Sequence, residues 1–166
     1  AGTRVLIGGL GFGFTLQRAL ELVTKDSAVH VAELLPVVVD WNREFLAAVN
    51  GSLLDDPRVT LFIEDVFVVL RRAAPASYDA ILLDVDNGPI AMVQDGNARL
   101  YERQGFAIIH RALKPGGRVP FWSAKNDRAF ASRLSRAGFE VDGVPAKPHE
   151  RARRSTHTIF VARRGA

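Results

Sequence analysis

The chain has 166 residues, of which 48% are hydrophobic and 24% charged, as is typical of one globular domain with a substantial core. It contains no cysteine, which excludes disulfides and thiolate metal sites and fits a reducing cytoplasm. No apolar run approaches the roughly 20 residues that span a bilayer, so we expect no membrane partner. Because the chain starts at Ala1 and enters an apolar strand almost at once, we expect a single domain over 1–166 that lacks an N-terminal segment.

Strand-like and helix-like segments alternate along most of the chain, which predicts a parallel sheet covered by helices. The predicted strands are Arg4–Gly8, Ala28–Glu33, Val59–Ile63, Tyr78–Asp84 and Gly117–Ser123. The predicted helices between them lie near Thr15–Leu22, Pro36–Asn50, Val66–Ala73 and Tyr101–Leu113. The first and fourth strands contain continuous apolar runs, which indicates that they are buried on both faces.

The last third of the chain departs from this alternation. Asp127–Ala137 is predicted to be helical, and Phe139–Val144 and Thr156–Ala162 follow as two strands with no helix between them. A strand, a loop and a final strand predict an antiparallel pair at the edge of the sheet. We therefore predict an α/β fold: a Rossmann-like, seven-stranded, mostly parallel sheet with an antiparallel final strand and helices on both faces.

A glycine-rich turn connects the first predicted strand to the first predicted helix. It reads Gly8-Gly9-Leu10-Gly11-Phe12-Gly13, and glycines there allow positive φ and a close approach of the backbone to a ligand. A dinucleotide fingerprint would place its last glycine at Phe14, whereas the spacing Gly9-x-Gly11-x-Gly13 is the form used by S-adenosylmethionine domains. The segment 114–117, Lys-Pro-Gly-Gly, is another habitual feature of those domains.

Acidic residues stand at the predicted carboxyl ends of three successive strands: Glu33, Asp65 and Asp84. Ligands of open α/β sheets bind outside these strand ends. Glu33 lies about 20 residues past the glycine turn, where a carboxylate can accept hydrogen bonds from ribose hydroxyls. Asp65 could accept one from an adenine amino group, and Asp84 and Asp86 would lie beside the reacting centre. Each acid taken alone could equally be a helix cap or a loop acid.

Together these features resemble the catalytic domain of the spermidine synthase (polyamine aminopropyltransferase) family, within the class I methyltransferase-like fold. The similar segments are Val5–Leu16, Glu33–Val38, Asp56–Val59, Glu64-Asp65 and Tyr78–Asp84. The resemblance implies binding of S-adenosylmethionine, its decarboxylated form or methylthioadenosine, with Gly8, Gly9, Gly11 and Gly13 at the cofactor. It also implies that Glu33 holds the ribose, Asp65 the adenine and Asp84 the reacting amine.

The sequence departs from this family at two points. Family members carry an aspartate inside the glycine turn that holds the aminopropyl nitrogen, and residues 8–13 contain no acid. After the strand-end aspartate the family has two hydroxyl residues and Asp-Pro, whereas this chain has Val85-Asp86-Asn87-Gly88-Pro89. The family's small N-terminal β-domain is also absent from these residues.

Three functions follow from these observations. The leading interpretation is aminopropyl transfer to an amine, with Asp84 and Asp86 as the catalytic acids and the polar segment Val85–Asn97 as a lid. The first alternative is a methyltransferase with an unknown acceptor, and the second is a nucleoside-binding module without catalysis. The expected partner is a small-molecule acceptor such as a polyamine, and a homodimer is an open alternative.

The remaining charged residues suggest little further chemistry. The net charge is +4, and one cluster of basic residues lies near the end of the chain, at Arg151, Arg153, Arg154, Arg163 and Arg164. A solvated basic tail is the expected interpretation, with a nucleic-acid patch as the alternative. The histidines at positions 30, 110, 149 and 157 lack metal-ligand spacing, so we predict no metal.

Overall fold

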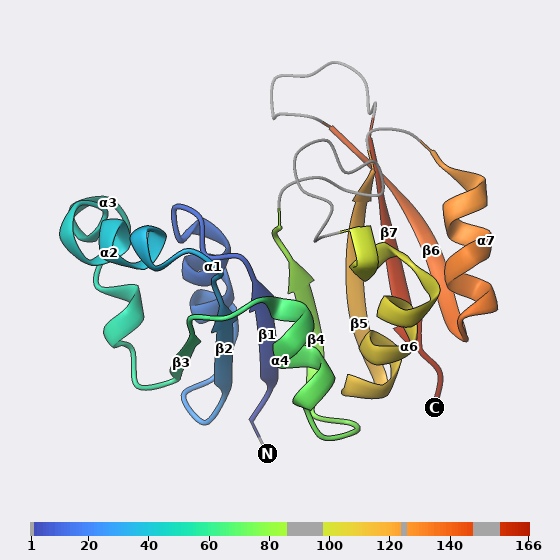
Figure 1. Ribbon diagram of the computed structural model, residues 1–166, viewed down its shortest axis with the longest axis horizontal. Helices are drawn as coiled ribbons and strands as arrows, with labels where there is room; N and C mark the ends of the chain where they lie inside the picture. Colours follow the sequence, from blue (N-terminus) through green and yellow to red (C-terminus); the bar gives the residue numbers. More distant parts are fainter. Residues whose placement is uncertain (1, 86–97, 124–125, 148–156) are drawn as a thin grey trace.

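A computed structural model describes residues 2–85, 98–123, 126–147 and 157–166. It contains a seven-stranded sheet with the strand order β3-β2-β1-β4-β5-β7-β6, which Figure 1 shows from left to right. The strands are β1 (Arg4–Gly8), β2 (Ala28–Ala32), β3 (Val59–Phe62), β4 (Tyr78–Leu83), β5 (Leu113–Ser123), β6 (Phe139–Ala146) and β7 (His157–Arg164). The first five pair in parallel and β7 pairs antiparallel with both β5 and β6, so the predicted fold class is confirmed.

Helices cover both faces of this sheet. They are α1 (Phe14–Leu22), α2 (Pro36–Glu44), α3 (Ala47–Asn50), α4 (Val66–Arg72), α6 (Arg103–Ala112) and α7 (Arg128–Arg136), with short 3-10 helices η1 (Leu53–Asp55) and η2 (Arg99–Tyr101). No helix in the described ranges is long and apolar enough to cross a membrane.

Two apolar cores show how the helices divide between the faces. Alternate residues of a strand point to opposite faces, so Val5 and Ile7 of β1 join one core while Leu6 joins the other. The core with Val5 also contains buried residues of α1 and α2, and the core with Leu6 contains buried residues of α4, α6 and α7. We call these two sets of helices the α1–α3 layer and the α4–α7 layer.

The predicted helix Pro36–Asn50 is wrong as a single element, because it breaks at Phe45 and Leu46. Both of their amides donate to the carbonyl of Trp41, at 2.9 and 3.0 Å, which widens the last turn of α2 and ends it. Helix α3 then starts anew at Ala47. The break redirects the chain, and this change of direction matters for the candidate site.

Strand β5 begins at Leu113 rather than at the predicted Gly117. Its pairing with β4 shifts between Tyr78↔Leu113 and Ala80↔Arg118, so the Lys-Pro-Gly-Gly segment forms an irregularity inside the strand rather than a loop before it. Gly116 has a φ of 78°, the left-handed conformation that such a bulge favours. The proline and glycines of this segment therefore indicate a distortion within the strand and not the start of the strand.

Candidate functional site at the carboxyl edge of the sheet

The glycine turn lies at the carboxyl edge of the sheet, the upper edge of β1 in Figure 1, and its backbone needs glycine. Gly9, Gly11 and Gly13 have φ values of 93°, 50° and 83°. A Cβ at Gly9 would lie 2.3 Å from the carbonyl oxygen of Asp84, and one at Gly8 would lie 2.8 Å from Cγ2 of Val66. The turn thus passes close to the end of β4, where a side chain would not fit.

Two buried asparagines of the α1–α3 layer hold this turn from behind. Asn42 Nδ2 donates to the carbonyls of Gly11 and Val38, both at 2.8 Å, and Asn50 Nδ2 donates to that of Phe12 at 2.5 Å. Asn50 reaches Phe12 because the chain turns between α2 and α3. Sequence reasoning missed both residues, since nothing local in the sequence indicates a contact across more than thirty positions.

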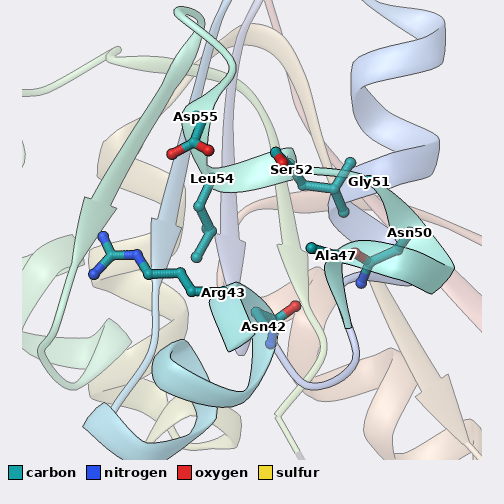
Figure 2. A pocket seen from close by; sticks show the side chains of 9 residues that line it. Asn42, Arg43, Ala47, Asn50, Gly51, Ser52, Leu54 and Asp55 are labelled. Atoms are coloured by element: carbon teal, nitrogen blue, oxygen red, sulfur yellow. The ribbon is translucent and has the colours of Figure 1, made fainter. Parts of the chain in front are cut away.

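A small cavity of about 210 Å³ lies beside these asparagines. It is lined by Asn42, Arg43, Ala47, Asn50, Gly51, Ser52, Leu53, Leu54 and Asp55. Figure 2 shows Arg43 and Asp55 on one side of the cavity and Asn50 on the other. None of the predicted cofactor-binding acids lines it, so we regard it as a space behind the turn rather than the nucleoside site.

Glu33 lies directly beyond β2 and is buried, with 7% of its surface exposed. Its Oε2 accepts the amide of Leu10 and its Oε1 accepts that of Leu35, both at 2.8 Å. The carboxylate therefore ties the glycine turn to the start of α2. An ionised carboxylate has about four acceptor positions, so each oxygen retains one for a further donor such as a hydroxyl.

Asp65 lies at the N-cap of α4, and its Oδ1 accepts the amide of Phe67 at 2.7 Å. Its Oδ2 forms an ion pair with Arg99, whose guanidinium also stacks 4.3 Å from the ring centroid of Phe67. Asp65 thus acts as a helix cap in the structure. Because both of its carboxylate oxygens already have a partner, an adenine amino group would have to share one of them. Arg99 is a further residue at this acid that the sequence did not indicate.

Asp84 follows β4 and is exposed. Its amide donates to the carbonyl of Gly8 at 2.8 Å, and its Oδ2 accepts the hydroxyl of Thr15 at 2.6 Å. Within the described residues Oδ1 has no hydrogen-bond partner. Asp84 therefore presents one anchored and one open carboxylate oxygen beside the glycine turn, an arrangement suited to receiving a proton.

Backbone hydrogen bonds bring the strand ends together in order. The Glu33 amide donates to Phe62, the Gly9 amide to Ala32 and the Asp84 amide to Gly8, at 2.8–2.9 Å. The three predicted acids and the turn therefore share one edge. Apolar side chains are exposed in the same turns: Phe12 (64%), Leu34 (50%) and Ile63 (51%). Exposed apolar residues between acids indicate an edge that accepts a flat apolar group together with polar ones.

Other predicted residues lie elsewhere. Asp86, Arg151, Arg153 and Arg154, and most of the segment 85–97, fall outside the described residues. His30 packs between Phe62 and Tyr78, and His110 packs on Phe139, so neither is near the turn. The described part of the chain contains no group of His, Cys, Asp or Glu that could hold a metal.

The residues present fit a sulfonium nucleoside such as S-adenosylmethionine. A Cβ at Gly11 would meet no atom within 4 Å, so the backbone of the turn is open there to the approach of a ligand. The buried Glu33 carboxylate suits hydroxyl donors, and the exposed apolar side chains suit a base. The exposed Asp84 carboxylate suits a cationic sulfur or amine.

Comparison with known proteins shows the family to which the sequence is similar. The spermine/spermidine synthase domain model matches residues 2–126. Putrescine N-methyltransferase 2 of Nicotiana tabacum is 38% identical over 116 residues, which make up 70% of this chain and 31% of that protein. A polyamine aminopropyltransferase of Mycobacterium tuberculosis is 36% identical over 115 residues, 68% of this chain and 21% of that protein. The chain thus spans a third or less of the length of these relatives.

Solved structures agree on the fold. A spermidine synthase in complex with the transition-state analogue AdoDATO superimposes with a TM-score of 0.74 at 20% identity, covering 99% of this chain and 55% of that one. Human methyltransferase-like protein 13 in complex with SAH gives a TM-score of 0.73 at 19% identity, covering 99% and 72%. Aminopropyltransferases and methyltransferases therefore share this architecture.

Proposed function

The chain belongs to the spermine/spermidine synthase domain family, and on this premise we propose that it transfers an aminopropyl group from decarboxylated S-adenosylmethionine to an amine. The observation that carries the proposal is the position of Asp84, with its open oxygen beside the glycine turn. The aminopropyltransferase relative supports the choice of reaction. The expected acceptor is a polyamine, the substrate class in the names of both relatives.

In this proposal the two other acids position the nucleoside. Glu33 accepts the ribose hydroxyls with the oxygen positions that the backbone amides leave open, and its burial strengthens those hydrogen bonds. Asp65 accepts from the adenine amino group while Arg99 and the Phe67 amide fix its orientation. Leu34 and Ile63 flank the base, since both are half exposed beside these acids.

Asp84 handles the proton of the reaction. A sulfonium nucleoside supplies an activated carbon, so the protein mainly aligns the reactants and excludes water. As the amine nitrogen bonds to that carbon and the carbon–sulfur bond breaks, Asp84 takes the proton that the amine releases. The hydroxyl of Thr15 holds the carboxylate in place through Oδ2. Asp86 is the second acid that we propose near this centre.

Methyl transfer from S-adenosylmethionine is the second candidate, favoured by a specific feature of the turn. Residues 8–13 contain no acid that could hold the amino group of an aminopropyl chain. The relatives named putrescine N-methyltransferase are 37–38% identical to this chain, compared with 36% for the aminopropyltransferase. Both reactions place an amine beside Asp84, so they differ in the cofactor and not in the role of this residue.

The test is to incubate the protein with putrescine and each cofactor separately, and to identify the product by mass spectrometry. Aminopropyl and methyl adducts differ in mass, so the product identifies the reaction. We expect Asp84→Asn to lower kcat/KM by about 100-fold or more, because the substitution replaces the carboxylate with an amide, which cannot accept the proton of the amine.

Asp79→Asn is the matched control for this variant. Asp79 lies on the same strand, β4, but near its opposite end, where it bonds the Arg4 amide and Lys114. We expect Asp79→Asn to leave the transfer rate within about twofold of wild type. An Asp84→Asn protein that transfers as fast as wild type would contradict the proposal and favour a nucleoside-binding module without catalysis.

A further inference from the structure

The α4–α7 layer carries arginines and no acidic residue on its helices. These arginines are Arg71 and Arg72 in α4, Arg103 and Arg111 in α6, and Arg128, Arg133 and Arg136 in α7. The α1–α3 layer is different: α1 pairs Arg18 with Glu21, and α2 carries Asp40, Arg43 and Glu44. The excess positive charge of the described domain is thus concentrated on one face, well separated in sequence from the basic end of the chain.

Most of these arginines have no carboxylate partner within the described residues. Arg72 pairs with Glu64, but Arg111 and Arg133 donate to backbone carbonyls and Arg136 Nε donates to that of Ser132 at 3.2 Å. Arg103 has no hydrogen-bond or ion-pair partner in the described part. Backbone carbonyls do not neutralise a guanidinium, so this face keeps its positive field.

A groove between α6 and α7 lies within this charged face. Its volume is about 520 Å³, and it is lined by Arg103, Phe106, Ala107, Arg133, Arg136 and Ala137. We call it the arginine groove. The alanines leave space between the three arginines, and no acid lines it. The acids nearest in sequence are Glu102, which precedes α6, Asp127, which caps α7 by accepting the Phe130 amide, and Glu140, which pairs with Arg163.

We propose that the arginine groove binds the phosphate backbone of a nucleic acid. Guanidinium groups match phosphate oxygens in a bidentate geometry and are less strongly hydrated than ammonium groups, and this layer uses arginine without lysine. Phe106 is only 2% exposed and cannot stack on a base. Recognition therefore rests on phosphate contacts, and binding is independent of base sequence. This inference stands apart from the proposed transfer reaction.

The test is fluorescence anisotropy with a fluorescein-labelled, mixed-sequence single-stranded DNA of about 20 nucleotides, and with the RNA of the same sequence, between about 50 and 200 mM NaCl. We expect the binding constant to fall steeply as salt rises, because each phosphate that is neutralised releases counterions. Binding should differ little between two unrelated base sequences.

Three variants locate the binding surface. We expect the triple variant Arg103→Gln, Arg133→Gln, Arg136→Gln to bind at least about tenfold more weakly, with a salt slope reduced by about two. The matched control, Arg4→Gln, Arg18→Gln, Lys25→Gln, has the same change in charge at exposed positions outside both the groove and the basic end of the chain, and it should retain nearly all binding. Because Arg133 also bonds Tyr101, the single variant Arg103→Glu, which breaks no described contact, serves as a second test and should weaken binding without changing Tm.

Other results would overturn the proposal. It fails if wild type does not bind either oligonucleotide, if the groove variants bind as tightly as wild type, or if the control triple variant loses as much affinity as the groove triple. It also fails if polyglutamate competes with the oligonucleotide equally well at the same concentration of charge. In that case the groove would be a surface for an acidic protein.

Discussion

On one face of the sheet, α2 and α3 bury the side chains of Asn42 and Asn50 against the glycine turn, whereas on the other face α4, α6 and α7 turn arginines outward. Both layers form apolar cores against the sheet. The buried asparagines of the α1–α3 layer thus fix the backbone of the glycine turn at the candidate site. The arginines of the α4–α7 layer instead set the charge of the outer surface. Removing polar groups from the two layers should therefore have different effects.

The substitution with the largest expected effect on stability and cofactor binding is at Gly9, where the glycine turn contacts the end of β4. Gly9→Ala places a Cβ 2.3 Å from the Asp84 carbonyl oxygen at a φ of 93°. We expect it to lower the free energy of unfolding by about 2–4 kcal/mol and to abolish cofactor binding, since overpacking and a left-handed backbone both oppose folding. Urea unfolding and calorimetry measure the two effects.

Gly116→Ala is the control for that variant. Gly116 also has a positive φ, of 78°, but a Cβ there meets no atom within 4 Å. We expect a loss of only about 1 kcal/mol from the backbone conformation, with unchanged cofactor affinity. Equal losses in the two variants would mean that the close approach of the turn to β4 contributes nothing.

The next prediction compares one polar side chain from each layer. Asn50→Ala leaves the carbonyl of Phe12 without its buried donor, so we expect a loss of about 1–3 kcal/mol and cofactor binding weakened about tenfold. Arg128→Ala removes an exposed side chain from the opposite layer and should change stability by less than about 0.5 kcal/mol. Unfolding curves and cofactor titrations of both variants test the contrast, which would be wrong if Asn50→Ala lost stability without any change in cofactor affinity.

The smallest expected effect is on the pH dependence of stability and comes from His30. This residue contacts the core of the α4–α7 layer through Tyr78 and Phe62. Burial, with a smaller contribution from the charge of Arg4, lowers the pKa of His30 below its usual 6.5. The unfolded chain then binds the proton more readily, so the stabilisation is present above about pH 6.5 and is lost as the pH falls below it. The free energy of unfolding of wild type should therefore fall more steeply between about pH 7 and 5 than that of His30→Gln. Parallel curves would contradict this assignment.

The sequence predicted the parts of this molecule that depend on local pattern. Buried parallel strands are continuously apolar, so β1 and β4 were recognised nearly to the residue, and the three acids could be placed at strand ends. The glycine turn was recognised because its spacing reflects backbone conformations that only glycine adopts easily.

Features that depend on tertiary contacts could not be predicted in this way. The break after α2 has no glycine or proline to mark it, and the contacts of Asn42 and Asn50 join distant segments. The Arg99 partner of Asp65 is 34 positions away. The separation of charge between the layers requires knowing which face each helix covers, which periodicity alone does not give.

The proposed function requires that the carboxyl edge bind a sulfonium nucleoside, the donor of the transferred group. Calorimetric titration of the protein with S-adenosylmethionine and, separately, with decarboxylated S-adenosylmethionine tests this claim most directly. The proposed function predicts binding of both, with tighter binding of the decarboxylated form, whereas tighter binding of S-adenosylmethionine would favour methyl transfer. If neither binds, the acids and glycines of this edge only support the fold, and the claim is wrong.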